Sequence, residues 1–268
     1  MNNTFSAPRF GKYFLNELNG AKYKFGLSAL IYGLMPVVFF VFYELIYFIT
    51  SGGDWGYDNA GNRIFCAFVV WVSLVMSFPT KVYGQVTDKR FGTSYILAPA
   101  SVFEKWLSMV LMACVVVPFA VGVLYFGTDS LLGLIFPETY GTPLLSIGFS
   151  EDVAVVLNGS VSMFSVWFVM WLYWCVNVLS FTLGAVFFKR NKSLKTLMVL
   201  AAVGFICMMV SFTIVGNVGG GEDFIVRFFG SEPEDAVRGM FTFLYVCAGV
   251  QIVILLSLLF ARLRNIKH

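Results

Sequence analysis

Six long apolar runs constrain this chain more strongly than any other feature of its sequence. A helix that crosses a membrane needs roughly 20 mostly apolar residues, because each residue rises about 1.5 Å through a hydrocarbon core about 30 Å thick. The runs predict membrane-spanning helices over residues 25–49, 64–80, 102–126, 160–188, 194–215 and 239–261. Pro36 and Pro118 lie inside the first and third of these runs, where each frees a backbone carbonyl that a neighbouring helix or water must satisfy. We therefore expect an all-α integral membrane protein, a single transmembrane domain over residues 1–268.

The amino-acid composition is typical of a chain that is embedded in a membrane. Of its 268 residues, 59% are hydrophobic and only 12% are charged, whereas soluble domains have roughly 45–50% and about 25%. A soluble chain of this length has too little interior to bury so much apolar surface, and a disordered chain would be poor in apolar residues. The net charge of +3 is too small to indicate a nucleic-acid partner.

The positions of the basic residues indicate how the spans face. Fifteen of the 18 Lys and Arg residues lie in the N-terminal segment, the second-to-third connection, the fourth-to-fifth connection or the tail, all on one side. Cytoplasmic connections are enriched in Lys and Arg. We therefore expect a multi-pass chain in the cytoplasmic (inner) membrane of a bacterial cell, with both termini in the cytoplasm. Residues 1–24 are too polar for a cleaved signal peptide, so we expect the first span to be retained as an anchor.

Residues 1–24 are predicted to form an amphipathic helix. At about 100° per residue, Phe10, Phe14, Leu18 and Ala21 share one face, and Lys12 lies opposite. A cytoplasmic helix of this kind before a first span lies in the headgroup layer of the bilayer, with its cations near anionic lipid. The alternative is an ordinary solvated leader.

The connection between the second and third spans carries two local signals. Ser101 followed by Glu104 just before an apolar run is a capping box, which predicts that the third span starts near Val102. Gly92 and Pro99 punctuate the chain on either side of residues 93–98, which leaves room for one or two helical turns on the membrane surface. Because the segment is basic and rich in apolar residues, we expect it to dock onto another protein. The alternative is a simple connector.

This connection resembles that of the type 2 permeases of ABC transporters, the membrane subunits of ATP-driven exporters. The shared pattern is a charged helix end, a Gly-Thr step in a short coupling helix, a Pro-x-Ser step and a Glu-Lys pair where the third span begins. The matching positions are Asp88, Lys89, Arg90, Gly92, Thr93, Pro99, Ser101, Glu104 and Lys105. Tyr95 departs from the pattern, since the family often has a further charge there. Six spans with both ends inside also agree with the family.

The resemblance implies a permease subunit that is not itself an enzyme and binds no cofactor. The chain lacks a nucleotide-binding motif, so ATP and Mg would bind to two separate ATPase subunits. Their closure on ATP would push a coupling helix and rearrange the spans, and the export path would lie between two permease chains, alike or homologous. The residues expected to receive the push are Asp88, Lys89, Arg90, Phe91, Gly92, Thr93, Tyr95, Pro99, Glu104 and Lys105.

Titratable groups are scarce within the predicted spans. The only His is His268, and Glu44 is the one charged residue well inside a span. Glu44 either anchors the span at the interface, alone or paired with Arg63, or acts in transport. Asn177 and Gln251 either join helices or contact cargo. Candidates for a permissive apolar path, whose residue types also suit lipid-facing helices, are Ser73, Ser77, Met208, Met209 and Phe212.

The scarcity of fixed charge favours an apolar or amphipathic cargo, such as a lipid, a peptide or a drug-like compound. Two other classes of function stay open. A non-transporting membrane partner (immunity, sensory or scaffold) is distinguished by the absence of an ATPase encoded beside it or purified with it. A secondary transporter predicts an inverted repeat and charged groups near the bilayer midplane, and the sequence shows neither.

Overall fold

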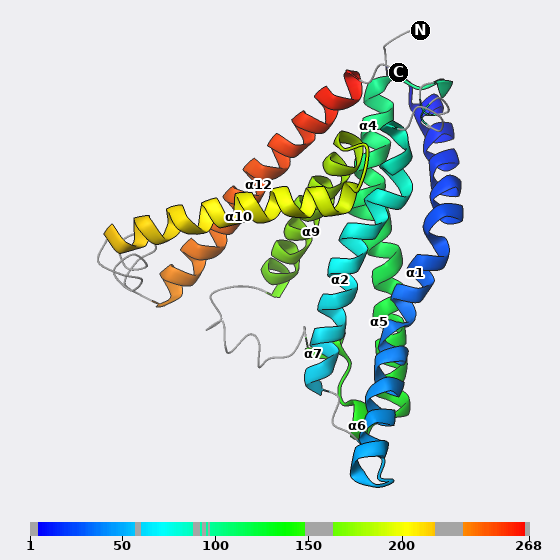
Figure 1. The fold of residues 1–268 in the computed structure, drawn as a ribbon, viewed down its shortest axis with the longest axis vertical. Helices are drawn as coiled ribbons and strands as arrows, with labels where there is room; N and C mark the ends of the chain where they lie inside the picture. Colours follow the sequence, from blue (N-terminus) through cyan, green and yellow to red (C-terminus); the bar gives the residue numbers. More distant parts are fainter. Residues whose placement is uncertain are drawn as a thin grey trace. The chain divides into compact units, whose positions relative to one another are not determined.

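The computed structural model describes residues 5–56, 60–87, 92, 95, 97–147, 163–217 and 233–265, and the regular elements among them are all helical (Figure 1). Six helices are long and apolar enough to cross a membrane, so the chain is a multi-pass, all-α membrane protein. The expected single transmembrane domain contains two compact units. The first comprises residues 1–82 and 97–150, and the second comprises residues 83–96 and 151–268. Each unit is described by itself.

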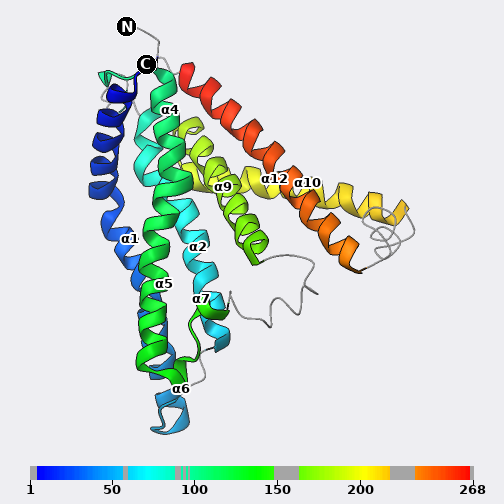
Figure 2. The same ribbon diagram turned by 180° about the vertical axis from the view of Figure 1, so that it is seen from behind.

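The first unit is built around a long helix pair. Its elements are α1 (Ala7–Ser51), α2 (Ala60–Tyr83), α4 (Val102–Leu111), the π-helical turn η2 (Met112–Val116), α5 (Val117–Ile135), α6 (Pro137–Tyr140) and α7 (Leu144–Ile147). Helix α1 packs along α5 and against α4 (Figure 2). The two long helices approach closely at Gly33, where an added Cβ would lie 2.5 Å from the Cβ of Leu124. A glycine is needed there because no side chain fits between the two backbones.

Helix α1 is continuous over 45 residues, with no break between the predicted helix in residues 1–24 and the predicted span over 25–49. Pro8 lies in its first turn, and it ends at Gly52, whose φ of 84° is left-handed. Neither Gly20 nor Gly26 interrupts it, because an isolated glycine costs a helix only about 1 kcal/mol. At about 1.5 Å per residue the helix is roughly 70 Å long, more than twice the hydrocarbon thickness.

The two prolines within the spans are accommodated in different ways. Pro118 lies two residues after the end of the π-helical turn η2, and such a turn absorbs the irregularity that a missing N–H imposes on a helix. In the turn before Pro36, the carbonyl of Gly33 accepts a hydrogen bond of 2.6 Å from Thr128 Oγ1 on α5. The carbonyl that Pro36 itself frees is that of Tyr32, four residues earlier, so the expectation that a neighbouring helix satisfies the freed carbonyl stays a prediction.

The second unit is a three-helix arrangement centred on α9. It contains the 3-10 turn η1 (Gly84–Thr87), α9 (Met163–Phe187), α10 (Lys192–Asn217) and α12 (Pro233–Arg264). Helix α9 packs against both α12 and α10. A tight turn at Asn191, with φ of 51°, joins α9 to α10, and an added Cβ on Gly184 would lie 1.8 Å from Thr196 Oγ1. The two helices can therefore meet this closely only at a glycine.

Several helices extend beyond the predicted spans. Helix α2 begins four residues before the predicted span over 64–80, and the third span reaches Ile135 rather than residue 126. The fifth and sixth, predicted over 194–215 and 239–261, start earlier and end later as α10 and α12. The fourth, predicted over 160–188, is described from Met163, and residues 160–162 lie outside the described part.

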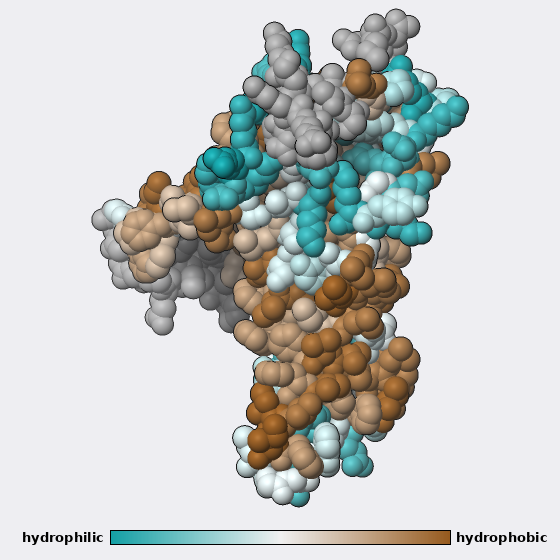
Figure 3. Space-filling model, turned by 45° about the vertical axis from the view of Figure 1, so that its right-hand side comes forward, coloured by the Kyte–Doolittle hydropathy of each residue, from teal (hydrophilic) through white to brown (hydrophobic). Residues whose placement is uncertain are grey.

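The surface of the first unit suits a membrane. In Figure 3 apolar residues cover much of the lower part of the visible face, and hydrophilic residues gather mainly in its upper part, toward the end where α1 and α4 begin. Large apolar side chains such as Leu27 and Val38 are more than half exposed. In a bilayer, lipid tails surround such side chains, so their exposure is expected for helices that span a membrane.

Candidate functional site

Glu104 is the centre of a polar cluster at the start of α4. Its carboxylate accepts hydrogen bonds from the Ser101 N–H at 2.7 Å and the Ser6 N–H at 2.9 Å, and from the Arg9 guanidinium at 2.7 Å. The Glu104 N–H donates in turn to Ser101 Oγ at 3.2 Å, so the predicted capping box is confirmed. We call Ser6, Arg9, Ser101 and Glu104 the Glu104 joint.

The Glu104 joint fixes the beginnings of two helices to each other. The Glu104 side chain is fully buried, and Arg9 reaches it from α1 through both Nε and Nη2. Hydrogen bonds between two charged groups in such a forked arrangement are stronger and more directional than neutral ones. One helical turn further along α4, Ser108 Oγ donates to a carboxylate oxygen of Glu17 on α1. The first turns of α1 and α4 therefore form one rigid end.

The predicted coupling segment is described only in part. Asp88, Lys89, Arg90, Phe91 and Thr93 lie outside the described residues. The Tyr95 N–H donates to the Gly92 carbonyl at 3.1 Å, which closes a turn, and Gly92 itself is buried. Leu97 and Pro99 are exposed, whereas Lys105 at the start of α4 is buried. The Leu97 side chain of this segment is thus exposed, a few residues before the Glu104 joint.

The candidate path residues divide between the two units. In the first unit, Ser77 Oγ lies 2.9 Å from the Tyr32 hydroxyl, which also approaches the Ser73 carbonyl at 3.5 Å. These serines therefore join α2 to α1. In the second unit, the path candidates on α10 are all exposed: Met208, Met209 and Phe212. Their role in a path stays a prediction.

The polar amides within the spans make no contact that favours cargo binding. Asn177 Nδ2 donates to the Tyr173 carbonyl of its own helix at 2.8 Å. Gln251 is exposed on α12. The hydrogen bond of Asn177 thus lies within its own helix, and whether Asn177 and Gln251 join helices or contact cargo stays a prediction.

A buried ion pair of the first unit was missed by the sequence reasoning. The Arg63 guanidinium on α2 lies 3.3 Å from both carboxylate oxygens of Asp129 on α5, and the two side chains are 4% and 0% exposed. Glu44, for which pairing with Arg63 was one of several predicted roles, accepts a hydrogen bond from the Gly56 N–H at 3.2 Å. Because α5 continues past residue 126, Asp129 enters the helix and reaches Arg63, which the predicted boundary did not allow.

Tyr140 completes this cluster. Its hydroxyl donates to Asp129 Oδ1 at 2.7 Å, its carbonyl accepts from Arg63 Nη1 at 2.9 Å, and its ring lies 4.4 Å from the Arg63 guanidinium carbon. The Leu144 N–H donates to Asp129 Oδ2 at 2.7 Å. Burial, and then the hydrogen bond to Asp129, raise the pKa of the Tyr140 hydroxyl above its ordinary value. The cluster therefore pins the turn after α5 onto α2 and α5.

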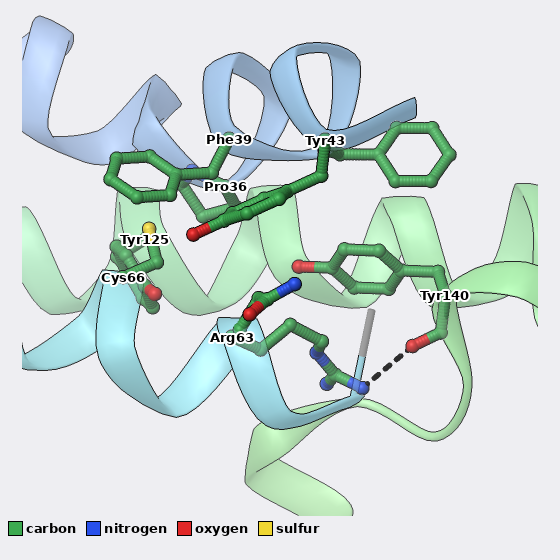
Figure 4. Close-up of a pocket in the computed structure, with 9 residues that line it drawn as sticks. Pro36, Phe39, Tyr43, Arg63, Cys66, Tyr125 and Tyr140 are labelled. Atoms are coloured by element: carbon green, nitrogen blue, oxygen red, sulfur yellow. Dashed lines mark hydrogen bonds between the residues drawn. The ribbon is translucent and has the colours of Figure 1, made fainter. Parts of the chain in front are cut away.

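A small hollow opens beside the ion pair (Figure 4). Its cavity volume is about 10 Å³, roughly the space of a single water molecule. Its lining residues are Pro36, Phe39, Phe40, Tyr43, Asn62, Arg63, Cys66, Tyr125 and Tyr140. Arg63 Nε is buried and has no hydrogen-bond partner among the described residues. The hollow thus offers one donor to a water molecule or a small acceptor group. Its walls contain no nucleophile paired with a base, so the arrangement is suited to holding helices in place.

The described residues include no group of three or more His, Cys, Asp or Glu side chains that could hold a metal ion. No family model, curated protein or solved structure matches the chain. The class that the fold defines is therefore that of multi-pass, all-helical membrane proteins.

Proposed function

We propose that this chain is the permease subunit of an ATP-driven exporter, similar to the type 2 permeases of ABC transporters. Two separate ATPase subunits bind ATP and Mg, and a second permease chain, identical or homologous, completes the path. The cargo is apolar or amphipathic, because fixed charges within the spans are few and the main ones, Arg63 and Asp129, neutralise each other. The observation that carries the proposal is the Glu104 joint, directly after the segment that resembles a coupling helix.

The joint supports a lever at the N-terminal flank of the third span. In the sequence, Pro99 stands two residues before Ser101. Ser101 is held to Glu104 and through it to Arg9 on α1. A push on the segment therefore reaches the first turns of two membrane-spanning helices together. Small displacements at one point become helix rearrangements when the elements between are rigid.

The other flank of the segment is held in the second unit. Lys192 Nζ, at the start of α10, donates to the carbonyl of Gly84 in η1. Gly84 stands four residues before Asp88, where the proposed coupling segment begins. Lys192 thus fixes the residues just before the proposed segment within the second unit. This second attachment favours the lever over a simple connector.

Purification of the tagged chain from membranes of its source cell, in a mild detergent, tests the proposal. We expect an ATP-binding-cassette ATPase to be present in fixed ratio and the complex to hydrolyse ATP. The Glu104→Ala variant should keep the ATPase bound, while ATP-driven transport by the reconstituted complex falls at least tenfold. A chain that purifies alone, or with a partner that has no ATPase, contradicts the proposal and favours a non-transporting membrane partner.

A further inference from the structure

The second unit carries a group of cations at the helix ends around the α9–α10 turn, and these cations have no counter-ion among the described residues. Its members are Lys189, Arg190, Lys195, Arg262 and Arg264. None of them forms an ion pair with a described acidic residue. The described part of this unit contains two acidic residues, Glu234 and Asp235, both in the first turn of α12. Along a continuous helix they lie roughly 40 Å from Arg262, several times the distance over which salt screens exposed charges.

Two of these cations are held in place by a pair of adjacent aromatic rings. The guanidinium carbon of Arg262 lies 5.2 Å from the centre of the Phe187 ring, and Lys195 Nζ lies 6.0 Å from that of Phe188. The two rings meet edge to face at 5.4 Å. Cations over aromatic faces keep their charge and their hydrogen-bond donors available to a further partner. Residues from α9, α10 and α12 thus converge on one spot.

This region combines a hydrogen-bond donor that has no partner among the described residues with an exposed apolar ring. Arg262 Nε is a buried nitrogen with no hydrogen-bond partner among the described residues, and the Phe187 ring is 57% exposed. The first turn of α10 carries no acidic residue, although acidic residues are favoured there. The local charge is therefore uncompensated within the described chain, and an exposed ring lies beside it.

We propose that Lys195 and Arg262, placed over Phe188 and Phe187, form a binding site for the phosphate of an anionic phospholipid. A lipid fits better than a soluble phosphate because the exposed Phe187 ring continues the apolar surface on which an acyl chain lies. The cations bind the phosphate, and each basic residue near an anionic membrane surface strengthens binding severalfold. This site is independent of whether the chain is an exporter.

Native mass spectrometry of the purified full chain tests the site. The probe is phosphatidylglycerol, offered in nanodiscs with phosphatidylcholine in equal parts, and the readout is the amount retained per chain. The double variant Lys195→Gln, Arg262→Gln should bind phosphatidylglycerol about thirtyfold more weakly. The charge-preserving variant Lys195→Arg, Arg262→Lys should retain it, which separates loss of charge from loss of folding.

The matched control is the double variant Lys189→Gln, Arg264→Gln, which removes the same charge from exposed positions of the same region. If the control variant retains nearly as much phosphatidylglycerol as the unaltered chain, the result supports a specific binding site at Lys195 and Arg262. An equal loss in the control overturns the proposal, because it shows diffuse attraction alone. Displacement of the lipid by millimolar inorganic phosphate overturns the choice of a lipid, and equal retention of both phospholipids overturns the site altogether.

Discussion

At the scale of single residues, the buried carboxylates of the first unit join separate helices to one another. A buried carboxylate is costly unless hydrogen bonds surround it. Asp129 receives donors from Arg63, Tyr140 and the Leu144 backbone. Glu104 is surrounded in the same way by backbone N–H groups and Arg9. Each carboxylate thus holds separate segments of the chain together, and this predicts what its removal costs.

Replacement of Glu104 by Ala should lower the stability of the protein by about 2 kcal/mol or more. The change removes the reciprocal cap of α4 and leaves the N–H groups of Ser101 and Ser6 without their acceptor. Thermal unfolding in detergent measures the loss. The control is Glu138→Ala, which removes an exposed carboxylate of the same sign. Equal melting temperatures for the two variants would show that the joint holds nothing.

Replacement of Tyr140 by Phe should destabilise the protein by about 1.5–3 kcal/mol, the usual value of a hydrogen bond to a charged group. Because the pKa of the Tyr140 hydroxyl is raised on folding, the protonated hydroxyl is the form that the folded state favours. Its contribution is fully present below the ordinary Tyr pKa of about 10 and is lost only as the pH rises above it. Unfolding measured from about pH 6 to about pH 9 should therefore show a constant difference, and a difference that shrinks over this range would refute the assignment.

At the scale of elements, close approaches depend on glycine. A Cβ on Gly184 would overlap Thr196 Oγ1 and lie 2.8 Å from the Thr196 Cβ, which the backbone fixes. The Gly184→Ala change should therefore push α9 and α10 apart at a cost of about 1–3 kcal/mol. Gly204→Ala on α10, where nothing lies within 4 Å, is the matched control and should be neutral or stabilising. Unfolding of both variants by heat checks this, and identical behaviour would mean that the two helices do not touch at Gly184.

The sequence predicted the elements better than their ends. Apolar runs located all six spans because the membrane imposes their length, and the Ser101 capping box located the start of α4 because that signal is local. The continuity of α1 was missed, since polarity changes near residue 24 while helix propensity does not. The Arg63–Asp129 pair was missed because it joins residues 66 positions apart, and a tertiary contact of this kind leaves no periodic pattern in the chain.

At the scale of the whole molecule, the orientation in the membrane stays a prediction from the Lys and Arg distribution. In a background without the five native cysteines, Arg190→Cys should react with an impermeant thiol reagent only after the cytoplasmic side is exposed. Asp54→Cys should react from outside in intact cells. Both positions are exposed in the structure, so accessibility depends on the side of the membrane. The reverse pattern of labelling would invert the topology and remove the coupling segment from the cytoplasm.

The proposed export function depends on a lever between Gly92 and the start of α4, driven by separate ATPases. The most direct measurement is ATP-driven uptake of labelled phospholipid, peptide and apolar drug-like probes into vesicles that hold the reconstituted complex in the inverted orientation. The unaltered complex should transport at least one probe, and the double variant Gly92→Leu, Pro99→Ala should lose that transport at least tenfold while the ATPase stays bound. Undiminished transport by the double variant, or transport by the chain without an ATPase, would contradict the account.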